Sequence, residues 1–272
     1  MKKLLLILLC LPLITLAQTY VPDANFEAEL EAQGLGDGIA NNQNVNTALV
    51  STHYNLNVSN KQIADLTGIE GFTNLGVLAC EYNLLTSLDL SNNLNLNLLH
   101  CQDNLLTSLN VSSNTELVYL WCDDNQLTTL DLSNNPLLHN LICETNQLTS
   151  LDISNNPDLT AFWCNDNQLT SLDLRNGHNV YITNLDCQDN PNLYCIDVDD
   201  PNWATIHWTT GNEIDSWASF SSNCLPSAIA EYSTNKELLK VTDLLGRETK
   251  QTNQPLFYIY DDGTVEKRIV IE

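Results

Sequence analysis

The stretch Leu117-Val-Tyr-Leu-Trp-Cys-Asp-Asp-Asn-Gln-Leu127 decides the fold, because close copies of it recur along the chain at a fixed interval. Each copy carries a cysteine and, three residues later, an asparagine. Successive copies are 21 residues apart, apart from a last step of 23 (Cys80, Cys101, Cys122, Cys143, Cys164 and Cys187; Asn83, Asn104, Asn125, Asn146, Asn167 and Asn190). A fixed period of this size is typical of a solenoid, in which each repeat forms one coil.

The second half of each repeat is a variant of the first. Leu127, Leu130, Leu132 and Asn135 have the spacing of Leu117, Leu120, Cys122 and Asn125. Each coil is therefore expected to contain two short alternating strands. Alternation places Leu120 and Cys122 on the inner side of a strand and Tyr119, Trp121 and Asp123 on the outer side. One coil cannot bury its apolar side alone, so successive coils must stack about 4.8 Å apart.

The repeated asparagines and cysteines are interpreted as structural. An asparagine at the end of a strand can bond backbone groups of its own coil and of the neighbouring coil. The six repeated cysteines are a coil apart, whereas zinc sites use short Cys-x-x-Cys spacings. They are expected to be small, buried, apolar residues with free thiols.

The motif Leu-x-x-Leu-x-Cys-x-x-Asn-x-Leu resembles the leucine-rich-repeat signature, with cysteine at the third apolar position. The nested 21-residue form resembles a bacterial variant, and the segment 63–75 (Ile63-Ala-Asp-Leu-Thr-Gly-Ile-Glu-Gly-Phe-Thr-Asn-Leu75) is similar to the first repeats of internalin-like surface proteins. This resemblance implies a mainly β fold, a leucine-rich-repeat solenoid of short parallel strands over residues 56–194. It also implies a binding function outside a bacterial cell.

The N-terminal residues 1–17 have the features of a secretory signal peptide. Lys2 and Lys3 precede an apolar run over residues 4–16, and cleavage is expected before Gln18. The rest of the chain has no apolar segment long enough to span a membrane. The sequence therefore predicts an exported protein without a transmembrane segment.

Residues 18–55 are expected to form an N-terminal cap that covers the first coil. A short helix is predicted between Tyr20 and Gly36, capped by Asp23 and ended by Gly34. Residues 37–55 are rich in Asn, Gln and Gly and are expected to be loops. A first, divergent strand is expected at residues 56–58.

The charge of the chain is strongly negative and unevenly distributed. The formal net charge is −24, and removal of Lys2 and Lys3 with the signal peptide makes it −26. No Lys or Arg occurs between Lys61 and Arg175, a stretch of 113 residues that carries 14 Asp and Glu. This balance argues against nucleic acid or an anionic lipid surface as a partner.

Residues 195–225 are expected to form a C-terminal cap closed by a disulfide between Cys195 and Cys224. The two cysteines lie outside the repeat, and an exported chain favours a disulfide. The nearby Asp197, Asp199 and Asp200 could bind Ca²⁺ through oxygen ligands. They lack the spacing and the glycine of a known calcium loop, so no cofactor is assigned and calcium stays an open alternative.

Residues 226–272 are expected to form a linker and a small β domain. Three strands are predicted, at 238–241, 256–260 and 267–271, with a hairpin turn at Asp261-Asp262-Gly263. The segment resembles the C-terminal sorting domain of cargo of the type IX secretion system of Bacteroidetes, in residues 243–247, 258–260, 262–263 and 267–272. That resemblance implies the type IX machinery as a partner and a protein that is secreted or held at the outer-membrane surface.

Function is predicted from a contrast between the two outer surfaces of the repeat. The second segment repeats Ser or Thr, Asp and Ser with little change, which leaves an ice- or mineral-binding protein as one alternative. The first segment varies and carries exposed aromatic and acidic residues, as binding surfaces do. The candidate ligand-binding residues are on or beside this segment (Tyr82, His100, Tyr119, Trp121, Asp123, Ile142, Glu144 and Trp163).

The predicted function is adhesion or recognition of an extracellular protein or glycan, without catalysis. The five histidines (His53, His100, His139, His178 and His207) share no catalytic or metal-ligand spacing, and no nucleophile motif or phosphate loop occurs. Neighbouring coils could still bring two carboxylates together. A glycan-active enzyme or an accessory carbohydrate-binding protein is therefore the other alternative.

Overall fold

The structure is a computed structural model that describes residues 17–208, 213–224, 238–242, 255–260 and 265–269. The chain divides into two compact units, Met1–Cys224 and Leu225–Glu272. The predicted signal peptide, residues 1–17, lies outside the described residues except for Ala17.

The N-terminal cap contains two short strands and two helices. Strand β1 (Gln18–Tyr20) pairs antiparallel with β2 (Asn44–Asn46), and helix α1 (Ala24–Ala32) lies between them in sequence. The Asp23 carboxylate accepts hydrogen bonds from the first backbone N–H groups of α1, and Gly34 follows the helix with a φ of 75°, as the sequence predicted.

The prediction of loops over residues 37–55 was wrong. This stretch contains β2 and helix α2 (Thr47–Val50). The Asn46 side chain accepts a hydrogen bond from the N–H of Ala48 and caps α2. The polar composition thus included a helix cap, while Val45 and Val50 supply the buried apolar side chains.

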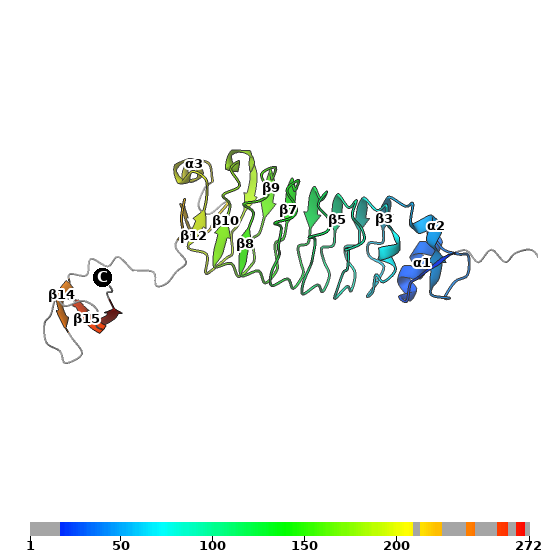
Figure 1. Ribbon diagram of the computed structural model, residues 1–272, viewed down its shortest axis with the longest axis horizontal. Coiled ribbons are helices and arrows are strands. Elements are labelled where there is room, and N and C mark those ends of the chain that lie inside the picture. The colour runs from blue at the N-terminus through cyan, green and yellow to red at the C-terminus, as the bar shows by residue number, and fades with distance from the viewer. Residues whose placement is uncertain (1–16, 209–212, 225–237, 243–254, 261–264, 270–272) are drawn as a thin grey trace, which may run out of the picture. The chain divides into compact units, whose positions relative to one another are not determined.

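The first segments of the repeats form a parallel sheet of seven strands, which lie side by side in Figure 1. Its order is β11-β9-β7-β6-β5-β4-β3, and each strand pairs in register with the next coil. The strands are β3 (Asn55–Asn57), β4 (Val77–Ala79), β5 (Leu98–His100), β6 (Tyr119–Trp121), β7 (Asn140–Ile142), β9 (Ala161–Trp163) and β11 (Asn184–Asp186). Short 3-10 helices occur at Ile69–Gly71 (η1) and Asn179–Tyr181 (η2).

The second segments form a smaller parallel sheet, and only toward the C-terminal end of the repeat. Its order is β13-β12-β10-β8, with strands β8 (Ser150–Asp152), β10 (Ser171–Asp173), β12 (Cys195–Asp197) and β13 (Ser219–Ser221). The expectation of two strands in every coil was therefore wrong for the earlier coils. There, the printed bonds between coils occur in the preceding turn, as from the N–H of Leu105 to the carbonyl of Leu85.

The core is one continuous apolar cluster that runs through the stacked coils. Leu78, Leu99, Leu120, Leu141 and Phe162 follow one another at its centre, each with 0% exposure. The six repeated cysteines are free and buried in this cluster, as predicted. Truncating one such leucine to alanine typically costs about 2–5 kcal/mol of stability.

The repeated asparagines form a structural ladder, also as predicted. The Asn104 side chain accepts from the N–H of Leu85 on the preceding coil and donates to the carbonyls of Cys80 and Cys101. The same pattern recurs in the following coils. A second ladder of buried asparagines lies half a coil away (Asn93, Asn114, Asn135 and Asn156). Backbone groups at the turns are thereby satisfied away from water.

The C-terminal end of the repeat is closed by helix α3 (Pro201–His207) and a disulfide. Strands β12 and β13 continue the smaller sheet beyond the expected boundary at residue 194. Cys195 and Cys224 are joined with an S–S distance of 2.06 Å. A disulfide over such a loop contributes about 3 kcal/mol. None of the helices in the described ranges has the length and apolar character needed to cross a membrane.

The second unit contains an antiparallel sheet of order β14-β15-β16. Its strands are β14 (Leu238–Thr242), β15 (Pro255–Tyr260) and β16 (Val265–Ile269). The predicted hairpin turn at residues 261–263 lies outside the described residues, while β15 and β16 on either side of it are paired.

Candidate functional site

The outer surface of the seven-stranded sheet carries three columns of side chains, here called the variable face. The first column lies on the last residue of each strand (Ala79, His100, Trp121, Ile142, Trp163 and Asp186). The second lies two residues earlier (Val77, Leu98, Tyr119, Asn140, Ala161 and Asn184). The third lies two residues after the first (Glu81, Gln102, Asp123, Glu144, Asn165 and Gln188). Backbone bonds between coils, such as Asp103 N–H to the Asp123 carbonyl at 3.1 Å, keep the third column aligned with the sheet.

Trp121 is at the centre of the variable face and is half-buried. Its ring stacks on that of His100, with centroids 4.1 Å apart and an interplanar angle of 15°. Its indole N–H donates to the side-chain oxygen of Asn140 at 3.0 Å. Ile142 and Trp163 follow it in register on the next two strands. The structure thus brings four of the predicted residues into one column, and a flat face of the Trp121 ring is covered by a neighbouring coil.

The two predicted tyrosines lie at the margins of the variable face. Tyr119 is 42% exposed and stands in the second column beside Asn140. Tyr82 is 57% exposed and lies at a corner of its coil with a φ of 56°. The negative charge of Asp103 is the largest cause that raises the pKa of the Tyr82 phenol.

The acidic side chains of the third column lie beside the aromatic column. Burial, followed by the charges of Glu144, Asp124 and Asp103, raises the pKa of Asp123 to about 7. Burial is also the main cause of a raised pKa at Glu144. Burial lowers the pKa of His100, which favours the neutral ring in the stack. Carboxylates in this column are therefore short of both water and positive charge.

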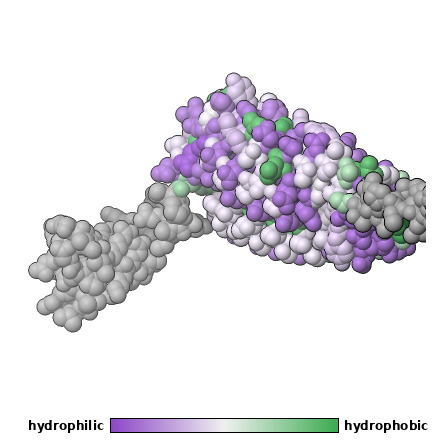
Figure 2. Space-filling model, turned by 45° about the vertical axis from the view of Figure 1, so that its right-hand side comes forward, coloured by the Kyte–Doolittle hydropathy of each residue, from purple (hydrophilic) through white to green (hydrophobic). Residues whose placement is uncertain are grey.

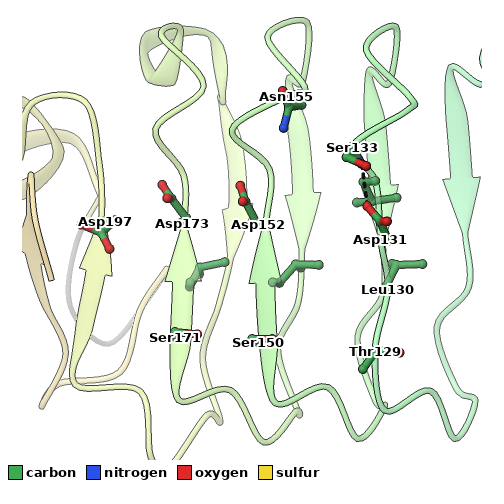
Figure 3. Close-up of a pocket in the computed structure, with 13 residues that line it drawn as sticks. Thr129, Leu130, Asp131, Ser133, Ser150, Asp152, Asn155, Ser171, Asp173 and Asp197 are labelled. Atoms are coloured by element: carbon green, nitrogen blue, oxygen red, sulfur yellow. Dashed lines mark hydrogen bonds between the residues drawn. The ribbon is translucent and has the colours of Figure 1, made fainter. Parts of the chain in front are cut away.

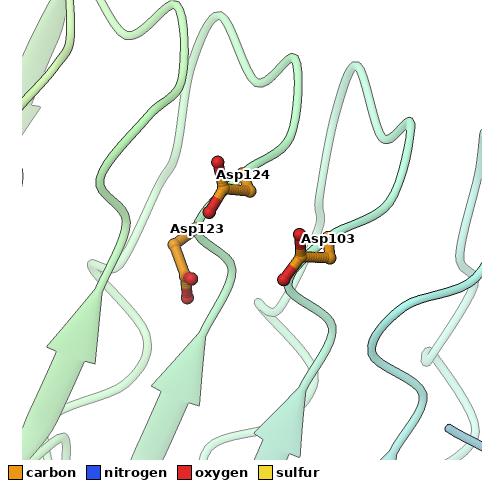
Figure 4. A group of neighbouring side chains, drawn as sticks. All are labelled: Asp103, Asp123 and Asp124. Atoms are coloured by element: carbon orange, nitrogen blue, oxygen red, sulfur yellow. The ribbon is translucent and has the colours of Figure 1, made fainter. Parts of the chain in front are cut away.

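A group of acids that sequence reasoning missed lies where the third column turns into the next loop. The carboxylates of Asp103, Asp123 and Asp124 offer oxygen atoms that all lie within 4.8 Å of one another (Figure 4). Such oxygens are the ligands that hard cations prefer. Asp103 and Asp124 occupy left-handed corner positions with φ of 52° and 48°. Asp is enriched there for backbone reasons, and the column of corner residues 21 apart was the available sequence signal.

The largest groove, about 450 Å³, lies on the other outer surface, here called the uniform face (Figure 3). Its columns are Thr129, Ser150 and Ser171, and Asp131, Asp152 and Asp173, with Asp197 at the end. Each repeated Asp accepts a hydrogen bond from the backbone two residues on, as from Ser133 at 3.0 Å and Ser154 at 2.8 Å. These bonds stabilise turns, so the repeated carboxylates already have a structural role.

The acidic residues of the C-terminal cap also have structural partners. Asp200 caps α3, Asp199 accepts from the N–H of Gly177, and Asp197 accepts from the N–H of Cys224 at 2.7 Å. Arg175 bonds the Asp173 side chain and the Ser222 carbonyl, and its guanidinium lies 3.6 Å from Asp197. These three acids are therefore explained by the closing of the cap.

Two of the five histidines share a hollow of about 440 Å³ at the loops between coils. His139 and His178 line it together with Tyr181. The His178 ring bonds the Pro157 carbonyl at 3.1 Å and packs edge-on against Tyr181 at 5.4 Å. These contacts position the loop of the longer, 23-residue coil, and sequence spacing gave no sign of them.

Comparisons with known proteins agree with the geometry of the repeat. No family model matches the chain. A segment of 77 residues, 27% of the chain, is 42% identical to Internalin J of Listeria monocytogenes serotype 4b (strain F2365) and covers 8% of that protein. The solved functional domain of InlJ from Listeria monocytogenes, described as including a cysteine ladder, matches 78% of the chain at 33% identity with a TM-score of 0.54.

A second internalin of Listeria monocytogenes, InlF, matches 66% of the chain with a TM-score of 0.52, and its 21% identity shows the fold alone. The chain spans half of the solved InlJ domain, about half of the InlF structure and a small part of whole Internalin J. The first unit thus has an internalin-like leucine-rich-repeat solenoid fold, and the predicted mainly β class is confirmed.

Proposed function

We propose that this chain is a secreted or cell-surface binding protein that holds an extracellular protein on its variable face. Internalin-like leucine-rich-repeat proteins are typically protein-binding and adhesion proteins. The observation that carries the proposal is the contrast between the two outer surfaces. The variable face presents a different side chain on each coil around Trp121, while the Asp residues of the uniform face bond their own turns.

The orientation of Trp121 favours a protein over a glycan as the partner. Sugar rings stack on the flat face of an indole, but a face of Trp121 already packs against His100. The exposed part of a half-buried, stacked ring suits apolar side chains of a polypeptide. Tyr119, which is 42% exposed, adds a hydroxyl beside this apolar column.

Export is the second part of the proposal. The signal-like residues 1–17 and the C-terminal segment that resembles a type IX sorting domain support it. The β14-β15-β16 sheet is a compact unit of its own, as a separable sorting domain requires. The type IX secretion machinery is the proposed partner of this unit, and the proposed location is the medium or the outer-membrane surface.

The ice- or mineral-binding alternative rests on the uniform face, and the glycan-active alternative on neighbouring carboxylates. A lattice-matching surface needs regular rows of free groups, whereas the Asp131 and Asp152 carboxylates accept backbone hydrogen bonds. Asp103, Asp123 and Asp124 do bring carboxylates together, but they lie on an outer corner of the coils (Figure 4). Protein recognition therefore remains the better supported proposal.

The test is a binding screen with the biotinylated chain lacking residues 1–17, on a panel of purified extracellular proteins and on a glycan array. A Trp121→Ala/Trp163→Ala double variant is screened in parallel, with Trp217→Ala as a matched control because Trp217 is 48% exposed in the C-terminal cap. The proposal expects a protein that binds wild type and the control but not the double variant. Binding only to glycans, or equal binding by the double variant, would contradict it.

A further inference from the structure

We infer that the variable face takes a cationic polypeptide segment, whose Lys or Arg head groups lie along the third column while apolar side chains lie over the Trp121 column. This inference rests on the proposed function and specifies the chemistry of the partner. It starts from the distribution of charge over the described residues.

The acids of the variable face have no basic partner in the described part of their own chain. Both described basic residues are engaged elsewhere: Lys61 lies 2.7 Å from Glu29 in the N-terminal cap, and Arg175 holds Asp173 and the cap. Acids occur in the first and third columns and at the neighbouring corners (Glu81, Asp103, Asp123, Asp124, Glu144, Asp166, Asp186 and Asp189). A positively charged partner is therefore complementary to the whole strip.

Hydrogen-bond acceptors in the third column lack donors as well as counter-charge. The Oε2 atom of Glu81 and the Oε1 atom of Gln102 are buried and accept no hydrogen bond within the described residues. Buried polar atoms normally have a partner. Lys offers three N–H donors and Arg five, and neither accepts hydrogen bonds, so these head groups fit a column of acceptors.

The apolar column beside the acids fits the rest of such a partner. His100, Trp121, Ile142 and Trp163 stand in line one position away from Asp123 and Glu144. Long cationic side chains lay their methylene stems on apolar surface and keep the charged end in a polar setting. A strand with alternating Lys and apolar residues would place both groups at once, because alternate side chains of a strand point to opposite sides.

The raised pKa of Asp123, about 7, agrees with this occupant. The groups that cause it besides burial are Glu144, Asp124 and Asp103, all negative when ionised. A cation placed among them would favour the ionised form of Asp123. Binding should therefore release protons near neutral pH and become stronger as the pH rises from 6 to 8.

The experiment measures binding of fluorescein-labelled 12-residue peptides by anisotropy, using the whole chain without residues 1–17. The peptides alternate Lys-Val, Lys-Ser or Glu-Val. The inference expects Lys-Val to bind best, Lys-Ser to bind at least fivefold more weakly and Glu-Val not to bind. Asp123→Asn/Glu144→Gln should weaken Lys-Val binding at least tenfold.

The matched control is Glu116→Gln/Asp158→Asn, which removes the same charge at two exposed turn positions outside the variable face. It should change Lys-Val binding less than twofold. Equal loss in both double variants would show attraction to net charge alone and overturn the inference. So would equal binding of Glu-Val, or calorimetric binding of Ca²⁺ at Asp103, Asp123 and Asp124 with no Lys-Val binding.

The outcome separates this inference from the proposed function. If the protein found in the screen needs Trp121 and Trp163 but binds Asp123→Asn/Glu144→Gln as well as wild type, the cationic partner is refuted while the binding face stands. If the Trp variants bind that protein normally, the proposed function itself fails. Lys-Val binding that is lost in both sets of variants supports both.

Discussion

The indole N–H of Trp121 donates to the side-chain oxygen of Asn140 on the next coil, at 3.0 Å. The two residues are 19 apart in sequence, and β6 pairs with β7 between them. The bond satisfies the indole and fixes the ring against His100. The central side chain of the variable face is therefore held in place before any partner binds, which reduces the ordering cost of binding.

Asn140→Ala should loosen Trp121 without unfolding the coil. We expect a loss of about 1 kcal/mol in the free energy of unfolding, the usual net value of one such hydrogen bond, and a red shift of tryptophan fluorescence. Urea unfolding and emission spectra provide the measurement. Asn184→Ala, at an exposed position of the same column, is the control and should change neither quantity. A blue shift or an unchanged spectrum in Asn140→Ala would contradict the assignment.

The six repeated thiols should resist alkylation in the folded protein. All are buried, and burial raises the pKa of the Cys122 thiol well above its usual value, so little thiolate is available. Mass spectrometry after iodoacetamide treatment should find no modification in the native chain and six modified cysteines after unfolding without a reductant. Rapid native labelling of Cys122 or Cys143, or labelling of Cys195, would contradict the placement of these residues.

Asp123→Asn should stabilise the protein at high pH. Its pKa is about 7 in the fold against a usual value of 3.8, so the folded state holds a proton that the unfolded state releases between pH 4 and 7. The free energy of unfolding of wild type should therefore fall as the pH rises through this range.

Because Asp123 is only half-buried, solvent screening reduces the effect, and we expect Asn to add about 1 kcal/mol at pH 8 and nothing at pH 4. Asp131→Asn is the matched control. A backbone hydrogen bond from Ser133 lowers the pKa of Asp131, so the same charge removal should give no stabilisation there. A loss of stability in Asp123→Asn at pH 8 would refute the argument.

Removal of residues 236–272 should leave the repeat folded and retain it in the periplasm. The two units are separately compact, so the truncated chain should keep the unfolding midpoint of the first unit. Cell fractionation and immunoblotting show where the protein accumulates. Normal delivery of the truncated chain to the medium or the cell surface would contradict the sorting role of the C-terminal unit.

The inner side of the coils could be predicted from sequence, since period and alternation specify it directly. Leu120 and Cys122 are buried because inward positions repeat every 21 residues, and the same period aligns Asn104 with Asn125. Strand formation in the second segment was not predictable. Ser87-Leu-Asp89 and Ser150-Leu-Asp152 have the same pattern, yet only the latter is a strand, because pairing depends on the distance between neighbouring coils.

The composition of the variable face was also predictable, but its internal contacts were not. Outward residues follow no periodic rule, so nothing in the sequence indicated that Asn140 accepts from Trp121 or that His100 covers its ring. The pKa of Asp123 depends on burial and on acids from neighbouring coils. Such properties arise only when the coils are stacked in three dimensions.

The central claim, that the variable face binds an extracellular protein, is tested most directly by calorimetry on the first protein that the screen returns. Trp121→Ala and Trp163→Ala, each shown to be folded by circular dichroism, should lose about 2 kcal/mol or more of binding free energy, as truncation of central aromatic residues does. Ser133→Ala on the uniform face and Trp217→Ala in the cap should bind like wild type. Wild-type affinity in both variable-face variants would contradict the account.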